Sequence, residues 1–157
     1  MHSRIFQISK NEITEDNLIQ DYRYHDYFVG KIADYVVDSD SKEQDLKWLI
    51  SCNKGLELIK EGNCYKLKIV SKAEYFAEKF EKFQGYLAEL SNYSLEDFIN
   101  SSKWLDMFRL KDSYDNEYGF YIDDNDEYFG VVTFDHFMRS AEDGDVYYIG
   151  NTFDYHY

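Results

Sequence analysis

The sequence predicts an α+β fold: a single domain spanning residues 1–157, with three or four helices and a mostly antiparallel sheet. The clearest sign of a sheet is an alternation of apolar and polar residues over Leu56–Lys60 and again over Cys64–Val70. Gly62 and Asn63, between the two runs, tolerate the positive φ that a hairpin turn requires. This segment is therefore expected to form two paired antiparallel strands.

The clearest sign of a helix follows directly. Ser71 and Glu74 form a capping-box pattern, in which each side chain can bond the other residue's backbone N–H. Apolar residues then recur at three- and four-residue spacing, which is typical of one face of a helix. They are Tyr75, Phe76, Phe80, Phe83, Leu87 and Leu90. Because strands and helices do not alternate regularly along the chain, a parallel βαβ arrangement is not expected.

The same rules predict further elements in the first two thirds of the chain. Ser3–Ser9 reads as a strand, and residues 32–37 fit either a helical turn or a strand. Residues 102–112 fit either a helix or a strand. Two more serine caps predict helices, one from Ser41 with Gln44 to about Cys52, and one from Ser94 with Asp97 through Phe98 and Ile99.

The last third is expected to hold a second set of strands. Tyr118–Asp123 and Tyr128–Thr133 read as two strands joined by an Asp-Asn-Asp turn. Thr133 is a candidate cap for a short helix over Phe134–Ala141, which Gly144 ends. Residues 145–150 and 152–157 then predict a closing hairpin with Gly150-Asn151 at its turn.

This last third, residues 111–157, is both strongly acidic and rich in Tyr and Phe. It holds twelve Asp and Glu residues against one Lys and one Arg, and therefore −10 of the net charge of −14. It also holds thirteen Tyr and Phe residues. Disordered acidic tails have few aromatic residues, so this composition indicates folded strands with an apolar and an anionic side.

The net charge of −14 narrows the range of partners. Direct binding to nucleic acid or to an anionic membrane requires a cationic surface, so neither is expected. A basic protein is the expected partner, with solubility alone as the other explanation for the acidity.

Cysteine content and the N-terminus point to a cytoplasmic protein. Cys52 and Cys64 are too few for a disulfide framework or a zinc site, and both are expected to be reduced core residues. Residues 1–10 lack the apolar run of a signal peptide, and no apolar stretch is long enough to span a membrane.

The sequence contains no common enzyme motif. It has no phosphate-binding glycine loop, no nucleophile elbow and no zinc-binding His-Glu-x-x-His pattern. The four histidines are spread along the chain, and His25 beside Asp26 would point to opposite faces of a strand. We therefore expect no catalytic residues and no cofactor.

A calcium loop is suggested by the alternating oxygen ligands Asp123, Asn125 and Glu127. However, Tyr128 stands where such a loop needs glycine, and Phe134 stands where it needs glutamate. An acidic hairpin turn is therefore expected here, and no metal site.

The remaining candidate is the anionic surface itself. Every second side chain of a strand shares a face at about 6.6 Å spacing, which approximates the spacing of phosphates along a nucleic-acid strand. Such carboxylates can occupy a basic groove, and tyrosines among them add stiff contact area. The alternative is that the tyrosines form the core and the acids only solvate the sheet. The predicted partner-binding residues are Asp112, Asp115, Glu117, Asp123, Asp124, Asp126 and Glu127, with Tyr114, Tyr118 and Tyr128 as anchors.

Three segments carry a resemblance. Ser3–Ser9, Ile32–Val36, and Tyr147–Gly150 with Asp154–Tyr157 resemble a small family of uncharacterised bacterial proteins, which implies no activity for any residue. In composition the chain is similar to acidic anti-restriction, anti-CRISPR and toxin-immunity proteins. We therefore expect an acidic, non-enzymatic protein-binding module, an inhibitor that mimics nucleic acid. The alternatives are a small enzyme or ligand-binding protein with a site assembled from distant residues, and a structural subunit.

Overall fold

The computed structural model describes residues 1–101, 103–125 and 130–157. It confirms the α+β class: within these residues the chain forms one seven-stranded sheet that is mostly antiparallel. The described residues contain more helices than the three or four predicted, namely five α-helices and two short 3-10 helices. The strands are β1 (His2–Ser9), β2 (Tyr35–Asp38), β3 (Leu56–Glu61), β4 (Cys64–Ile69), β5 (Tyr121–Asp124), β6 (Val131–Thr133) and β7 (Val146–His156). The helices are η1 (Glu15–Asn17), η2 (Asp21–Tyr24), α1 (Lys42–Cys52), α2 (Lys72–Ser91), α3 (Leu95–Ile99), α4 (Trp104–Tyr114) and α5 (Phe134–Ser140).

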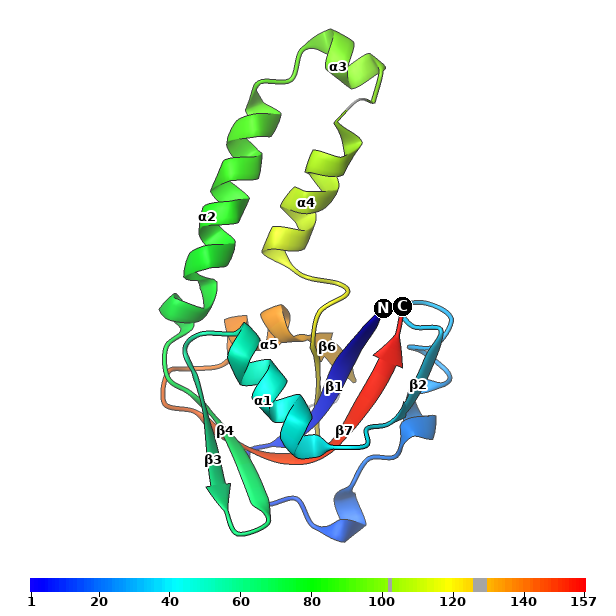
Figure 1. The fold of residues 1–157 in the computed structure, drawn as a ribbon, viewed down its shortest axis with the longest axis vertical. Helices are drawn as coiled ribbons and strands as arrows, with labels where there is room; N and C mark the ends of the chain where they lie inside the picture. The colour runs from blue at the N-terminus through cyan, green and yellow to red at the C-terminus, as the bar shows by residue number, and fades with distance from the viewer. Residues whose placement is uncertain (102, 126–129) are drawn as a thin grey trace.

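The longest strand, β7, organises the sheet (Figure 1). The strand order is β3-β4-β7-β1-β5-β6, and β2 also pairs with β7. The first half of β7 pairs with β4 and the second half with β2, while β1 lies along its other edge. Only the β1–β5 pair is parallel among the described strands; all the others are antiparallel.

The prediction of a closing hairpin at Gly150-Asn151 is wrong, because both residues lie inside β7. Gly150 serves a close approach rather than a turn. A Cβ atom there would lie 2.3 Å from Oε1 of Gln7, and the β1–β7 register shifts between Phe6 and Ile8. The glycine therefore makes room for a buried side chain of β1.

The serine and threonine caps are confirmed. The side chains of Ser41, Ser71, Ser94 and Thr133 each accept a hydrogen bond from the third following backbone N–H. The structure also decides the two segments that fitted either a helix or a strand. Residues 35–38 form a strand, and residues 104–114 form a helix. Cys52 is exposed rather than in the core, at the end of α1, and Cys64 is half-buried.

Apolar side chains pack on both faces of the sheet. One cluster combines Phe6 and Ile8 of β1 with residues of α1 and α5. The other combines Ile5 of β1 with residues of the segment between β1 and β2, including Tyr24. The sheet therefore has helices on one face and an irregular N-terminal layer on the other.

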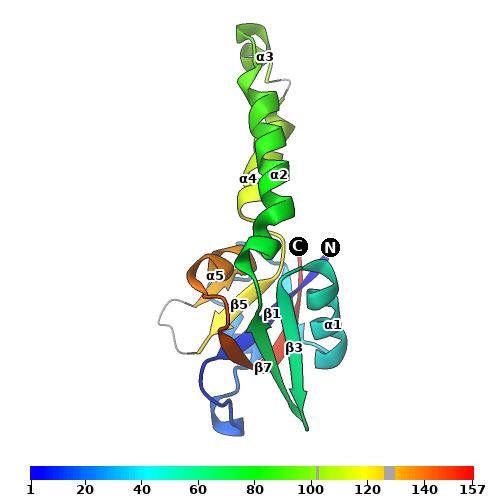
Figure 2. The ribbon, with the colours of Figure 1, turned by 90° about the vertical axis from the view of Figure 1, so that its left-hand side faces the viewer.

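Two helices leave this body and project from it (Figures 1 and 2). α2 and α4 run side by side and antiparallel, and α3 lies at the far end. We call residues 72–114 the arm, and the end nearest the sheet its root. The predicted apolar face of α2 packs on the body at Tyr75 and Phe76, whereas Phe80 and Leu87 further along are 58% and 50% exposed.

Candidate protein-binding surfaces

Asp123, predicted to contact a partner, is fully buried at the end of β5. The Arg23 guanidinium contacts its carboxylate at 3.1 and 3.3 Å. Burial raises the pKa of this carboxyl, and Arg23 lowers it in part. Burial, followed by the charge of Asp123, also raises the pKa of the Tyr24 and Tyr27 hydroxyls. Asp123 therefore holds η2 onto the sheet, a role that sequence reasoning missed because its partner lies 100 residues away.

Three other predicted acids lie at or near the arm root. Asp115 accepts a hydrogen bond from the Thr133 hydroxyl, and Glu117 pairs with Lys111 at 2.6 Å. Asp112 is half-buried on α4, and burial raises its pKa. Each acid thus has a local structural setting that sequence spacing alone does not reveal.

The two described anchor tyrosines also lie near the root. The Arg139 guanidinium lies 4.2 Å from the centre of the Tyr114 ring, and Tyr118 stacks on Tyr157 at 4.8 Å. Asp124 lies at the end of β5 away from the root, so the predicted residues that the structure describes do not form one continuous site. Asp126, Glu127 and Tyr128 lie outside the described residues.

A second acidic segment lies next to the end of β5. Residues 11–41 hold eight acids and two bases, a signal that the sequence contained but the denser last third overshadowed. The side-chain amide of Asn125 donates to the carbonyl of Asn17 at 3.0 Å and joins the turn after β5 to η1. We call five exposed residues of this region the acidic face: Glu12, Glu15, Asp16, Tyr22 and Asp26.

The carboxylates of the acidic face lack ion-pair partners among the described residues. Within residues 1–101, 103–125 and 130–157, Glu12, Glu15, Asp16 and Asp26 form no ion pair. Tyr22, among them, is 70% exposed. A depression of about 610 Å³ beside them is lined by Gln20, Tyr22, Arg23 and Asp26. These exposed carboxylates come from the irregular layer between β1 and β2, and not from the last third of the chain on which the prediction was based.

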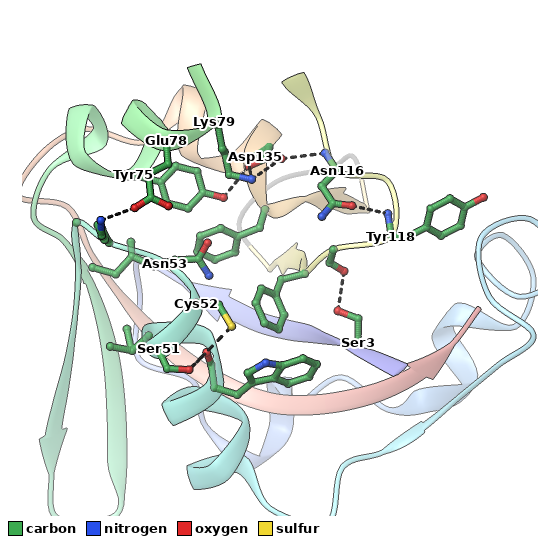
Figure 3. A pocket seen from close by; sticks show the side chains of 18 of the residues that line it. Ser3, Ser51, Cys52, Asn53, Tyr75, Glu78, Lys79, Asn116, Tyr118 and Asp135 are labelled. Carbon is green, nitrogen blue, oxygen red and sulfur yellow. Dashed lines mark hydrogen bonds and ion pairs between the residues drawn. The ribbon is translucent and has the colours of Figure 1, made fainter. Parts of the chain in front are cut away.

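A larger cavity of about 890 Å³ lies at the arm root (Figure 3). Its apolar lining includes Trp48, Phe120 and Phe134, and its lysines are Lys54, Lys79 and Lys82. His25 lines neither of these two cavities.

The carboxylate of Asp135 connects several segments at the arm root (Figure 3). Asp135 of α5 accepts hydrogen bonds from the Tyr75 hydroxyl at 2.7 Å and from the Asn116 backbone N–H at 2.9 Å. Lys79 forms an ion pair with it at 2.9 Å. The same buried group therefore anchors α2 and the segment that follows α4 to the body.

The raised pKa of Asp123 predicts that the free energy of unfolding depends on pH. Because its pKa is higher in the folded than in the unfolded state, the folded state keeps this proton longer as the pH rises. The group therefore contributes less stability as the pH rises from the ordinary Asp pKa through the folded value. Asp123→Asn should gain unfolding free energy relative to wild type between about pH 4.5 and about pH 7. Urea titrations at both pH values check this; a constant difference would show that burial does not control the carboxyl.

The described residues contain no group of three or more His, Cys, Asp or Glu side chains arranged to hold a metal ion. None of the described helices has the length and apolar character needed to cross a bilayer.

Fold and surface together define an α+β protein with an acidic face and a projecting helical arm. Comparison with protein-family models, with curated proteins and with solved structures gave no match.

Proposed function

We propose that this protein binds a basic protein through its acidic face and thereby inhibits, or serves as an adaptor for, a nucleic-acid-handling protein. The observation that supports this is the set of exposed carboxylates at Glu12, Glu15, Asp16 and Asp26, which have no ion pair in the described parts of the chain. Unpaired surface carboxylates attract a basic partner without first breaking internal bonds. Their fields steer association and are weakened by salt.

The layer that carries these acids is held to the sheet. Arg23 reaches the buried Asp123, and the Gln7 side chain bonds the backbone at Asn17 and Ile19. Fixed carboxylates resemble the fixed charges of a nucleic-acid backbone better than those of a disordered tail do. Tyr22 adds a flat, exposed ring of the kind that stabilises protein interfaces.

Charge reversal tests this function. Glu12→Lys, Asp16→Lys and Asp26→Lys together take the net charge from −14 to about −8. A matched control reverses three exposed acids elsewhere, Glu57, Glu81 and Glu142, and reaches the same net charge.

The wild type, the acidic-face variant and the control are each immobilised on beads and incubated with nuclease-treated bacterial lysate. Bound proteins are eluted with rising salt and identified. We expect wild type and control to retain the same basic protein and the acidic-face variant to lose it, because only that variant places repulsive charges in the contact. Duplex DNA should then compete with the wild type for this protein. Equal retention by all three chains would overturn the assignment to the acidic face.

A further inference from the structure

The arm exposes more large apolar surface than the rest of the described chain. Ten of the eighteen exposed large apolar side chains lie on it: Phe80, Leu87, Leu95, Phe98, Ile99, Trp104, Leu105, Met107, Phe108 and Tyr114. Phe98 is 73% exposed and Trp104 63%. Single exposed apolar residues are common on proteins, but ten of them on one projecting element indicate an interaction surface.

Helical spacing gathers these side chains. Phe80 and Leu87 are seven residues apart, and Trp104, Met107 and Phe108 follow the i, i+3, i+4 pattern, so each set shares a helix face. Successive residues turn by about 100°. The half-buried residues of α2 and α4 lie where the two helices contact each other. Counting the rotation from that contact places Phe80, Leu87 and Met107 on the same side of the arm.

The exposed area suits a protein interface. An aromatic side chain contributes roughly 200 Å² when fully exposed. Four aromatic residues of the arm, Phe80, Phe98, Trp104 and Phe108, are 58%, 73%, 63% and 43% exposed, so they present on the order of 450 Å². A stable interface buries about 800 Å² on each partner. The aliphatic residues of the arm can supply much of the remainder.

Charge distinguishes the arm from the body and indicates what covers it. Residues 72–114 carry eight acids and six bases, so the arm holds only −2 of the −14, and the body holds −12. The distal stretch of residues 83–102 contains Glu89, Glu96 and Asp97 and no base. The root cavity is lined by Lys54, Lys79 and Lys82 but also by Glu74, Glu78 and Asp135, so its formal charges balance. The nearly neutral arm can therefore face the arm of a second copy without the repulsion that two bodies of −12 would experience.

We propose that a second copy of this chain covers the arm, with two arms paired antiparallel so that α3 of each copy lies at the root cavity of the other. The tip supplies Leu95, Phe98 and Ile99, and the cavity supplies the rings of Trp48, Phe120 and Phe134. The pairing is symmetric, so each contact occurs twice, as in most homodimers.

The antiparallel direction also separates the two acidic bodies. The twenty residues of α2 are about 30 Å long. Charges are screened over about 8 Å at physiological ionic strength, so bodies at opposite ends of paired arms repel little. Parallel arms would place both bodies, and both acidic tips, side by side.

The mass in solution tests whether the arms pair. Light scattering of the full chain over a concentration series should give about 38 kDa, twice the chain mass of 18.8 kDa. Phe80→Glu with Met107→Glu should return it to the monomer mass, whereas Tyr22→Glu with Val37→Glu, exposed apolar residues of the body, should not. Circular dichroism confirms that each variant is folded. A wild-type monomer at every concentration would overturn the proposal and leave the arm for a different protein.

A cysteine cross-link tests the direction. Cys52 is exposed and lines the root cavity, so it reports on whatever enters there. Ile99→Cys places a thiol on the tip, and Cys64→Ser removes the other native cysteine. Under a mild thiol oxidant we expect a covalent dimer in which Cys52 is joined to the new cysteine at position 99. A dimer joined through the two introduced cysteines would show tip-to-tip pairing and contradict the antiparallel arrangement.

Discussion

Replacing Asp135 with alanine should lower the free energy of unfolding by about 3–5 kcal/mol, because a buried charge pair is broken and only one member is removed. The Asp135 side chain is 2% exposed, and it bonds Tyr75, Lys79 and the backbone of Asn116. The variant leaves a lysine, a hydroxyl and a backbone N–H without their acceptor. Urea unfolding at neutral pH measures the loss.

Glu43→Ala is the matched control. Glu43 also has three partners, Lys47, Lys60 and the Tyr65 hydroxyl, and they hold the pKa of its carboxyl down to about 2. Its side chain is nevertheless 45% exposed, so water replaces the lost bonds and its removal should cost much less. Similar losses in the two variants would show that the Asp135 network does not anchor the arm.

The second large effect is expected at Gln7, which is fully buried in β1. Its side chain donates to the Asn17 carbonyl at 2.8 Å and accepts from the backbone N–H groups of Ile19 and Asn151 at 3.1 and 3.0 Å. Gln7→Leu keeps the approximate volume but leaves these backbone groups without partners. A buried unsatisfied group costs about 1–3 kcal/mol, so we expect a loss of about 3–5 kcal/mol in total.

Gln44→Leu makes the same chemical change at an exposed position of α1 and should have little effect. Limited proteolysis adds a local readout: Gln7→Leu should speed cleavage within residues 11–20, because Gln7 holds this segment to the sheet. Unchanged cleavage, or equal losses of stability in the two variants, would rule out that role.

Local chemistry made part of the fold predictable. Serine and threonine caps act on backbone groups three residues away, and the β3–β4 hairpin depends on Gly62. Gly150 shows the limit of such reasoning. A glycine in a turn and a glycine beside a buried side chain look alike in sequence. Only the position of Gln7 in the structure shows that Gly150 is of the second kind.

The candidate site was less predictable for the same reason. Asp123 was expected at the surface, but it is buried, and the partly exposed Arg23, far away in sequence, pairs with it. The apolar pattern of α2 predicted a helix without showing whether the body, α4 or another molecule covers each residue. Acid content alone does not distinguish a carboxylate that anchors the fold from one that is free for a partner.

The central claim is that free carboxylates of the acidic face bind a basic protein, and the affinity for the purified partner tests it most directly. Titration at low and at physiological salt compares wild type with the variant carrying Glu12→Lys, Asp16→Lys and Asp26→Lys. We expect the variant to bind more than about tenfold more weakly, a change of about 1.4 kcal/mol, and the wild-type affinity to fall as salt rises. Equal affinities that do not respond to salt would contradict the claim.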